Sequence, residues 1–65
     1  MIQAKNMWEA AQLHQITTVA ACDQKINLLG EYVGRSRDAA EQSDWSAKIK
    51  FLKQLREQLQ PSTNS

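Results

Sequence analysis

The sequence predicts an all-α protein, a two-helix antiparallel hairpin that dimerises into a helical bundle. Glycine and proline are scarce, with two and one among 65 residues, whereas good helix formers are common. Apolar residues recur at helical spacing in two separate segments. A lone hairpin of this length buries too little surface to be comfortably stable, so self-association is expected.

The first predicted helix covers residues 5 to 33 and contains a coiled-coil seam. Its seam residues are spaced alternately four and three apart: Gln15, Val19, Cys22, Ile26, Leu29 and Val33. This 3.5-residue repeat is typical of a helix that buries one stripe against another helix. No proline interrupts the segment, and Gly30 costs only about 1 kcal/mol relative to alanine. We therefore expect one continuous helix up to Val33.

The predicted connection between the helices covers residues 34 to 38. Gly34 suits the left-handed conformation that often closes a helix. Asp38 is a good N-cap, and Glu41, three residues later, completes an arrangement like a capping box. The alternative start of the second helix is Ser43 or Asp44.

The second predicted helix ends near Gln60, because Pro61 disfavours helical geometry in the residue before it. Its seam residues are Trp45, Lys48, Leu52, Leu55 and Leu59, with Ile49 and Phe51 on the flanks. We assign residues 1–60 to a single helical-hairpin domain and residues 61–65 to a disordered tail.

A second set of apolar residues in the first helix lies off the seam and predicts a protein interface. Its members are Met7, Trp8, Leu13, Ile16 and Ala20. In a lone hairpin, Leu13 and Ile16 would be left in water, at a cost of about 1.5–3 kcal/mol each. We expect this face to form a homo-oligomer, with a dimer favoured; the alternative is docking of a different protein.

Positively charged residues are concentrated from the turn onward and are candidate contacts for an anion or a nucleic acid. They are Arg35, Arg37, Lys48, Lys50 and Lys53. Acidic residues are interleaved with them and the net charge is only +1, which is typical of a solvated face. For Lys48 we expect the stem to pack on Trp45 while the amine reaches water. The alternative is a partner carboxylate or a ligand anion at this amine.

No catalytic, phosphate-binding or metal-binding motif is present in the sequence. His14 and Cys22 are the only soft metal ligands, and their spacing places them roughly 80° apart around a helix. A seam cysteine usually acts as a small hydrophobic residue. We therefore expect neither enzymatic activity nor a cofactor or metal.

The location expected from the sequence is the cytoplasm. A lone seam-facing thiol fits a reducing compartment. The N-terminus lacks the basic-then-apolar pattern of a signal peptide. No run approaches the roughly 20 apolar residues of a membrane span, so we expect no membrane association.

The function predicted from the sequence is a non-enzymatic helical interaction module that binds and regulates, inhibits or chaperones a larger protein. One alternative is a nucleic-acid-binding dimer that uses the basic turn and the second helix. Another is a small-anion or nucleotide sponge formed by an oligomer. In outline, the hairpin is similar to unrelated small helical proteins, including plasmid copy-control RNA-binding dimers, small secretion chaperones and phage-encoded inhibitors. This likeness is one of shape and assigns no site residues.

Overall fold

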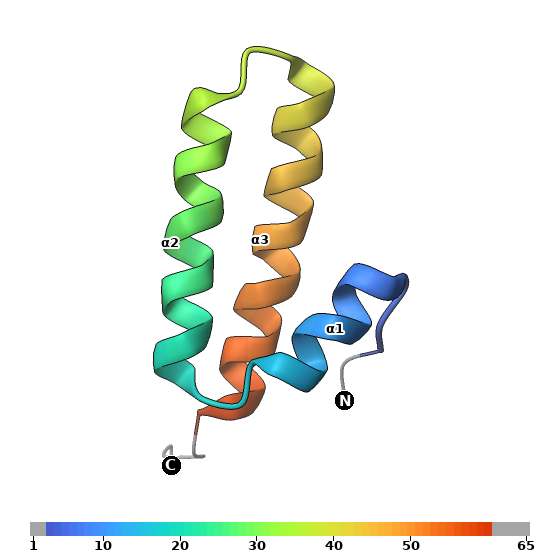
Figure 1. The fold of residues 1–65 in the computed structure, drawn as a ribbon, viewed down its shortest axis with the longest axis vertical. Helices are drawn as coiled ribbons and strands as arrows, with labels where there is room; N and C mark the ends of the chain where they lie inside the picture. The colour runs from blue at the N-terminus through green and yellow to red at the C-terminus, as the bar shows by residue number, and fades with distance from the viewer. Residues whose placement is uncertain (1–2, 61–65) are drawn as a thin grey trace.

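The computed structural model describes residues 3–60, which form three helices and no strand. α1 spans Met7–Gln15, α2 spans Val19–Arg35 and α3 spans Ala39–Leu59. α2 and α3 lie side by side in opposite directions, while α1 lies beside one end of the pair and contacts α3 (Figure 1). The predicted all-helical class is confirmed, but the architecture has three helices where two were expected.

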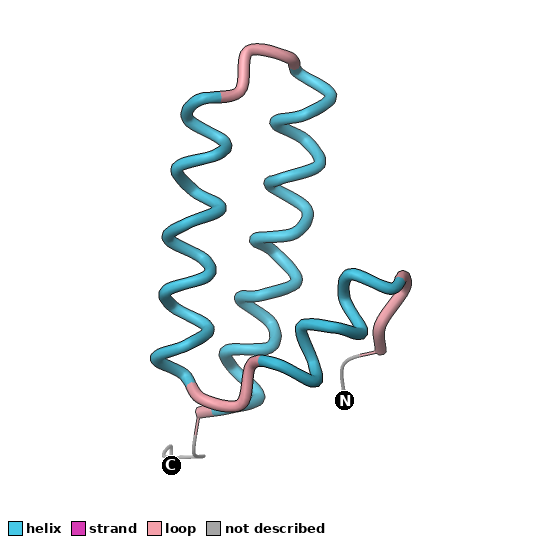
Figure 2. The backbone as a smooth tube through the Cα atoms, in the orientation of Figure 1, coloured by secondary structure: helices cyan, strands magenta, loops and turns pink. Residues whose placement is uncertain are grey.

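The prediction of one helix over residues 5–33 is wrong at Ile16–Thr18 (Figure 2). Both ends of this break are extended, with φ −97° and ψ 108° at Ile16 and φ −131° and ψ 155° at Thr18. Thr18 caps α2, because its Oγ1 accepts a hydrogen bond from the Ala21 amide at 3.1 Å. Ile16 turns into the core and is 6% exposed. Capping and burial together offset the helical hydrogen bonds that the break gives up.

The start of the last helix agrees with the predicted cap. Asp38 is the N-cap of α3, and its Oδ1 accepts a hydrogen bond from the Ala40 amide at 3.1 Å. The alternative start at Ser43 or Asp44 is therefore wrong. Glu41 makes a different contact from the one expected, since its carboxylate accepts a hydrogen bond from the Ser36 hydroxyl at 2.9 Å.

Gly34 does not close α2 as predicted. The helix continues to Arg35, and no described residue has a positive φ. Ser36 ends the helix instead, since its amide donates to the Tyr32 carbonyl at 3.0 Å and to the Val33 carbonyl at 3.2 Å. The Gln42 side-chain amide donates to the Ser36 carbonyl at 2.7 Å. Polar side chains therefore fix the hairpin turn without any left-handed residue.

The centre of the core lies between α2 and α3. Cys22, Leu29 and Leu52 are its most completely buried side chains, each at most 2% exposed. The Cys22 thiol donates a hydrogen bond to the Leu52 carbonyl, with sulfur and oxygen 3.0 Å apart. Two further α3 residues, Phe51 and Leu55, are buried in the same cluster as Ile16. α3 thus buries a broad face, part of it against α2 and part of it against α1.

Two further sequence predictions concern the chain as a whole. The predicted tail over residues 61–65 lies outside the described residues. Within the described part of the chain, each helix is too short or too polar to cross a membrane.

Leu52→Ala tests the position of the core. Removing a leucine side chain from a fully buried site leaves a cavity, so we expect a loss of about 2–5 kcal/mol in the free energy of unfolding. Urea denaturation followed by circular dichroism measures it. The matched control is Leu28→Ala, because Leu28 is 39% exposed; a loss there as large as that at Leu52 would contradict the assigned core.

Gly30→Ala tests whether the glycine at position 30 destabilises α2. Gly30 lies inside α2 without positive φ, and a Cβ built there meets no atom within 4 Å. Alanine should therefore raise the free energy of unfolding by about 1 kcal/mol. The same change at Gly34, which is equally open but lies one residue before the end of α2, should give less. Destabilisation by Gly30→Ala would show that the space beside this glycine is filled in solution.

Candidate functional site

All four aromatic side chains of this chain pack in two pairs that draw on all three helices. The composition includes two tryptophans, one tyrosine and one phenylalanine. The rings of Tyr32 and Trp45 have centroids 5.0 Å apart. Those of Trp8 and Phe51 meet edge to face, with centroids 6.1 Å apart. Both separations lie within the range in which aromatic rings attract one another.

Lys48 joins the two aromatic pairs. Its Nζ lies 5.4 Å from the centroid of the Trp8 ring and also 5.4 Å from that of the Trp45 ring. A cation at this distance is attracted by the negative face of each indole. The predicted neighbour, Trp45, is present, and Trp8 is a second one that the sequence analysis missed. The ammonium of Lys48 therefore lies between two indoles, and the side chain is half-buried.

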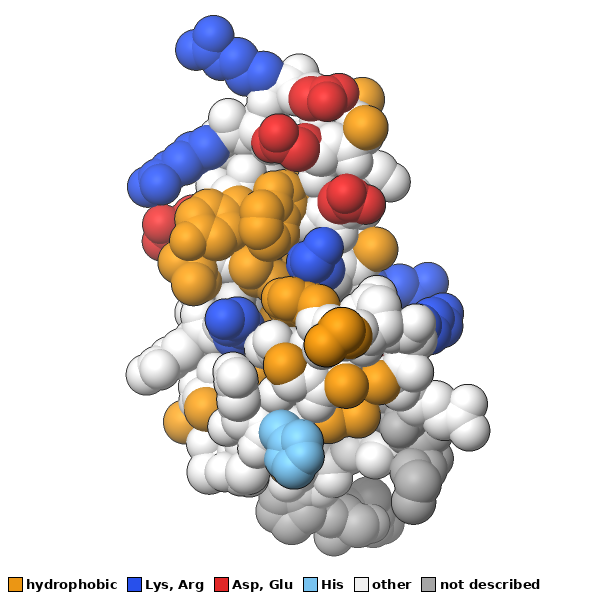
Figure 3. Space-filling model, turned by 45° about the vertical axis from the view of Figure 1, so that its right-hand side comes forward, with side chains coloured by type: hydrophobic (Ala, Val, Ile, Leu, Met, Phe, Trp, Pro, Cys, Tyr) orange, Lys and Arg blue, Asp and Glu red, His pale blue; other side chains and the backbone are white. Residues whose placement is uncertain are grey.

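We call Trp8, Tyr32, Trp45 and Lys48 the aromatic face. All four are half-buried, so each keeps part of its side chain in contact with solvent. Leu28 lies one helical turn before Tyr32 on α2 and is 39% exposed, which places it at the rim of this face. Apolar side chains gather over the middle of the molecule with cationic groups among and beside them (Figure 3). A contiguous exposed apolar patch is one of the features that binding surfaces share.

A hollow of about 420 Å³ adjoins the aromatic face at the hairpin turn. Tyr32 and Trp45 form part of its wall, and Arg35, Ser36 and Glu41 provide its polar groups. An aromatic surface beside charges of both signs provides apolar area together with hydrogen-bonding partners.

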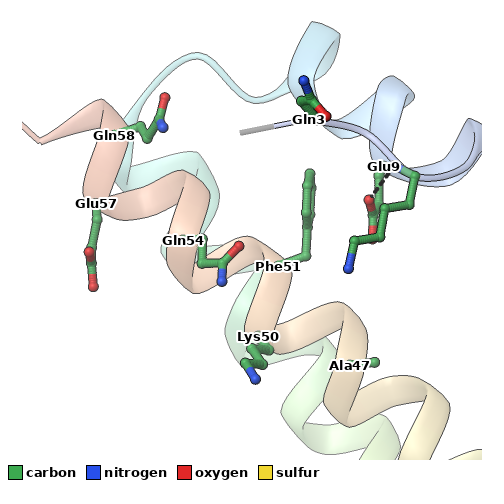
Figure 4. A pocket seen from close by; sticks show the side chains of 9 residues that line it. Gln3, Glu9, Ala47, Lys50, Phe51, Gln54, Glu57 and Gln58 are labelled. Carbon is green, nitrogen blue, oxygen red and sulfur yellow. Dashed lines mark hydrogen bonds between the residues drawn. The ribbon is translucent and has the colours of Figure 1, made fainter. Parts of the chain in front are cut away.

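Another hollow, of about 890 Å³, lies between the N-terminal segment and α3 (Figure 4). Its lining residues are Gln3, Lys5, Glu9, Ala47, Lys50, Phe51, Gln54, Glu57 and Gln58. The Lys5 amide donates to the Glu9 carboxylate at 2.7 Å, and both residues line the hollow. Among residues 3–60, no serine, cysteine or histidine lines it. The lining therefore offers amide and charged contacts without a nucleophile of those types.

The structure distributes the five predicted interface residues over different environments. Met7 is 88% exposed and Ala20 is also exposed, whereas Ile16 is buried. Trp8 and Leu13 are half-buried and pack against the core. The premise that Leu13 and Ile16 would be left in water in a single chain was wrong, because the break after Gln15 turns α1 back onto α3.

The five predicted basic contacts do not converge on one surface. Lys50 and Lys53 line a hollow of about 370 Å³ together with Gly30 and Val33 of α2. Both lysines lie roughly 140–160° around the α3 axis from Lys48. Arg37 is exposed in the turn. Arg35 is partly neutralised, since its Nη2 lies 3.6 Å from the Glu31 carboxylate.

Two polar contacts that contribute to the packing were missed. Arg56 of α3 pairs with Asp23 of α2, with Nε and Oδ1 2.6 Å apart. Gln12 is only 4% exposed, and its Nε2 donates to the Trp8 carbonyl at 3.3 Å. Gln12 lies four residues after Trp8 and four before Ile16, so helical periodicity gave a signal for its burial. Nothing local in the sequence pairs Arg56 with Asp23.

Among the described residues, no three histidine, cysteine, aspartate or glutamate side chains lie close enough together to hold a metal ion. Comparison with models of protein families, with curated proteins and with solved structures gives no match for this chain.

Because the Cys22 thiol is buried, we expect the free energy of unfolding to fall at alkaline pH. Burial raises the pKa of this thiol above its ordinary value of 9.0, with a smaller contribution from the Asp23 carboxylate. The neutral thiol is therefore favoured in the folded state, while the unfolded chain ionises at the ordinary value. The stabilisation is complete below pH 9.0 and is lost as the pH rises toward the folded pKa.

Urea denaturation between neutral pH and about pH 10 measures this effect. Cys22→Ala should be less stable at neutral pH because of the cavity it leaves. Its free energy of unfolding should nevertheless fall less steeply in the alkaline range. If the free energy of unfolding fell equally with pH in the wild type and in Cys22→Ala, ionisation of the Cys22 thiol would not be coupled to folding.

Proposed function

We propose that this protein is a non-enzymatic interaction module that binds a segment of a larger protein through the aromatic face. The observation that carries the proposal is the grouping of both tryptophans and the tyrosine on one surface, where each stays half-buried. The fully buried centre of the core is supplied instead by Cys22, Leu29 and Leu52. Binding of this kind is how such a module regulates, inhibits or chaperones its partner.

The chemistry of the aromatic face suits protein recognition. Tryptophan and tyrosine supply large contact area at a small loss of side-chain entropy, and they are enriched among residues that dominate binding energy. Lys48, held between the two indoles, provides a cation at the centre of the surface. A partner carboxylate placed there would gain a charge-assisted hydrogen bond. Arg35 and Glu41, beside the neighbouring hollow, provide a polar rim.

The nucleic-acid alternative has less support. A phosphate backbone is best met by a continuous row of basic groups. Here Lys50 and Lys53 lie far around α3 from Lys48, and Arg35 is close to Glu31. The net charge of the whole chain is only +1. Protein binding therefore accounts better for the surface than nucleic-acid binding does.

Capture from a lysate of the native host with immobilised protein tests the proposal. Leu28→Glu places a charge on the rim of the aromatic face at an exposed position, so the fold should tolerate it. Asn27→Glu is the matched control, because it adds the same charge to an adjacent exposed position that lies roughly 100° around α2. We expect Leu28→Glu to weaken capture at least roughly tenfold.

The expected result is a protein retained by the wild type and by Asn27→Glu but lost from Leu28→Glu. Binding of that protein to Tyr32→Ala, with circular dichroism as a check on folding, then tests an aromatic residue directly. Equal capture by all variants, or no enrichment above an unrelated bait, would count against the aromatic face as the binding surface.

A further inference from the structure

The break between α1 and α2 is built from residues that can also form a helix. Ile16, Thr17 and Thr18 include neither glycine nor proline. The 3.5-residue repeat of α2 starts at Val19, directly after the break, and its next position back is the polar Gln15. A straight helix over residues 7–35 would leave the α2 seam in register with α3.

Two contacts hold the break in the single chain. One is the cap at Thr18, whose Oγ1 accepts a hydrogen bond from the Ala21 amide at 3.1 Å. The other is the burial of Ile16, which is 6% exposed. Straightening the chain would replace the cap with main-chain hydrogen bonds inside the helix. It would also carry Ile16 away from its own core, so that only another surface could bury it again.

α1 is held less firmly than the other two helices. It has nine residues, and helices of that length rarely persist in water without packing. Gln12 is 4% exposed in this contact, and its Oε1 has no hydrogen-bond partner within residues 3–60. A buried acceptor without a partner disfavours the packed state. Release of α1 therefore has a lower free-energy cost than separation of α2 from α3.

We infer that two copies of this chain exchange α1. In each copy, residues 16–18 become helical, α1 and α2 join into one helix, and α1 docks on α3 of the second copy. The occupant is a second copy because α1 already fits this surface in the single chain, where Trp8 packs on Phe51 and Lys48. Apart from the renewed burial of Ile16, exchange between identical chains thus needs no new complementary surface. The inference does not depend on the proposed function, although it would complete each aromatic face with a tryptophan from the second copy.

Proline substitutions at the break distinguish this exchange from any other association. Thr17 lies outside both helices, and Ile16 before it has a ψ of 108°, which suits the residue that precedes proline. Val19 is the first residue of α2, a position where proline is favoured. Thr17→Pro and Val19→Pro are therefore compatible with the broken chain. Either one would disrupt the interior of the straight helix.

The opposite change is a double variant, Thr17→Ala with Thr18→Ala. It removes the cap from Thr18 and raises the helix propensity of the break, so it should favour the straight helix. Formation of a dimer by exchange straightens two such breaks, one in each copy, and each substitution therefore acts twice.

Sedimentation equilibrium of the full chain, from about 1 μM to about 1 mM, measures the dimer fraction by mass action. We expect a concentration-dependent dimer for the wild type. The double alanine variant should lower its dissociation constant at least roughly tenfold. Each proline variant should raise it at least about 100-fold. Circular dichroism identifies which proline variants remain folded, and the double alanine variant serves as the test if neither does.

Three results would overturn the exchange. The first is a wild type that stays monomeric at every concentration. The second is a folded proline variant that dimerises as well as the wild type, which would indicate association of intact three-helix chains. The third is an unchanged dissociation constant in the double alanine variant.

Discussion

The contact on which the rest of the structure depends is the one between α2 and α3 at Cys22, Leu29 and Leu52. These side chains are nearly or fully excluded from water, and the Cys22 thiol is hydrogen bonded to the Leu52 carbonyl. α1 has nine residues and contacts α3. Because a helix of that length needs a surface to pack on, it depends on a hairpin that is already formed. The fold is therefore hierarchical, with the hairpin as the stable unit and α1 as the element added to it.

This hierarchy explains which parts of the fold could be predicted from the sequence. The seam positions Cys22, Leu29 and Leu52 follow from the spacing of apolar residues, which is a local property of the chain. The cap at Asp38 is local for the same reason. The break at Ile16–Thr18 is different, because its residues suit both a continuing helix and a capped end. The burial of Ile16 decides between them, and that burial exists only once α3 is in place.

The candidate site was predictable only in the part that one helix contains. Lys48 and Trp45 are three residues apart on α3, so their contact follows from helical spacing. Trp8 comes from α1 and reaches this surface only after the chain turns back at the break, whereas Tyr32 comes from α2 and reaches it through the hairpin turn. The separation of Lys48 from Lys50 and Lys53 could also have been read from helical spacing. Counting basic residues without their helical positions does not show that Lys48 and the other two lysines lie on different sides of α3.

The position of Trp8 couples the proposed binding function to the weakest part of the fold. Trp8 is the contribution of α1 to the aromatic face, and it contacts both Phe51 and Lys48. A partner that binds Trp8 and Trp45 together interacts with the docked form of α1 and not with a released one.

Binding of such a partner and docking of α1 are therefore linked. The partner stabilises docked α1, and docked α1 strengthens partner binding, by the same free energy. The amide oxygen of buried Gln12, which has no hydrogen-bond partner within residues 3–60, opposes that docking. The aromatic face is thus complete only in chains whose α1 is docked. The affinity for a partner that needs Trp8 is reduced by the fraction of chains in which α1 is released.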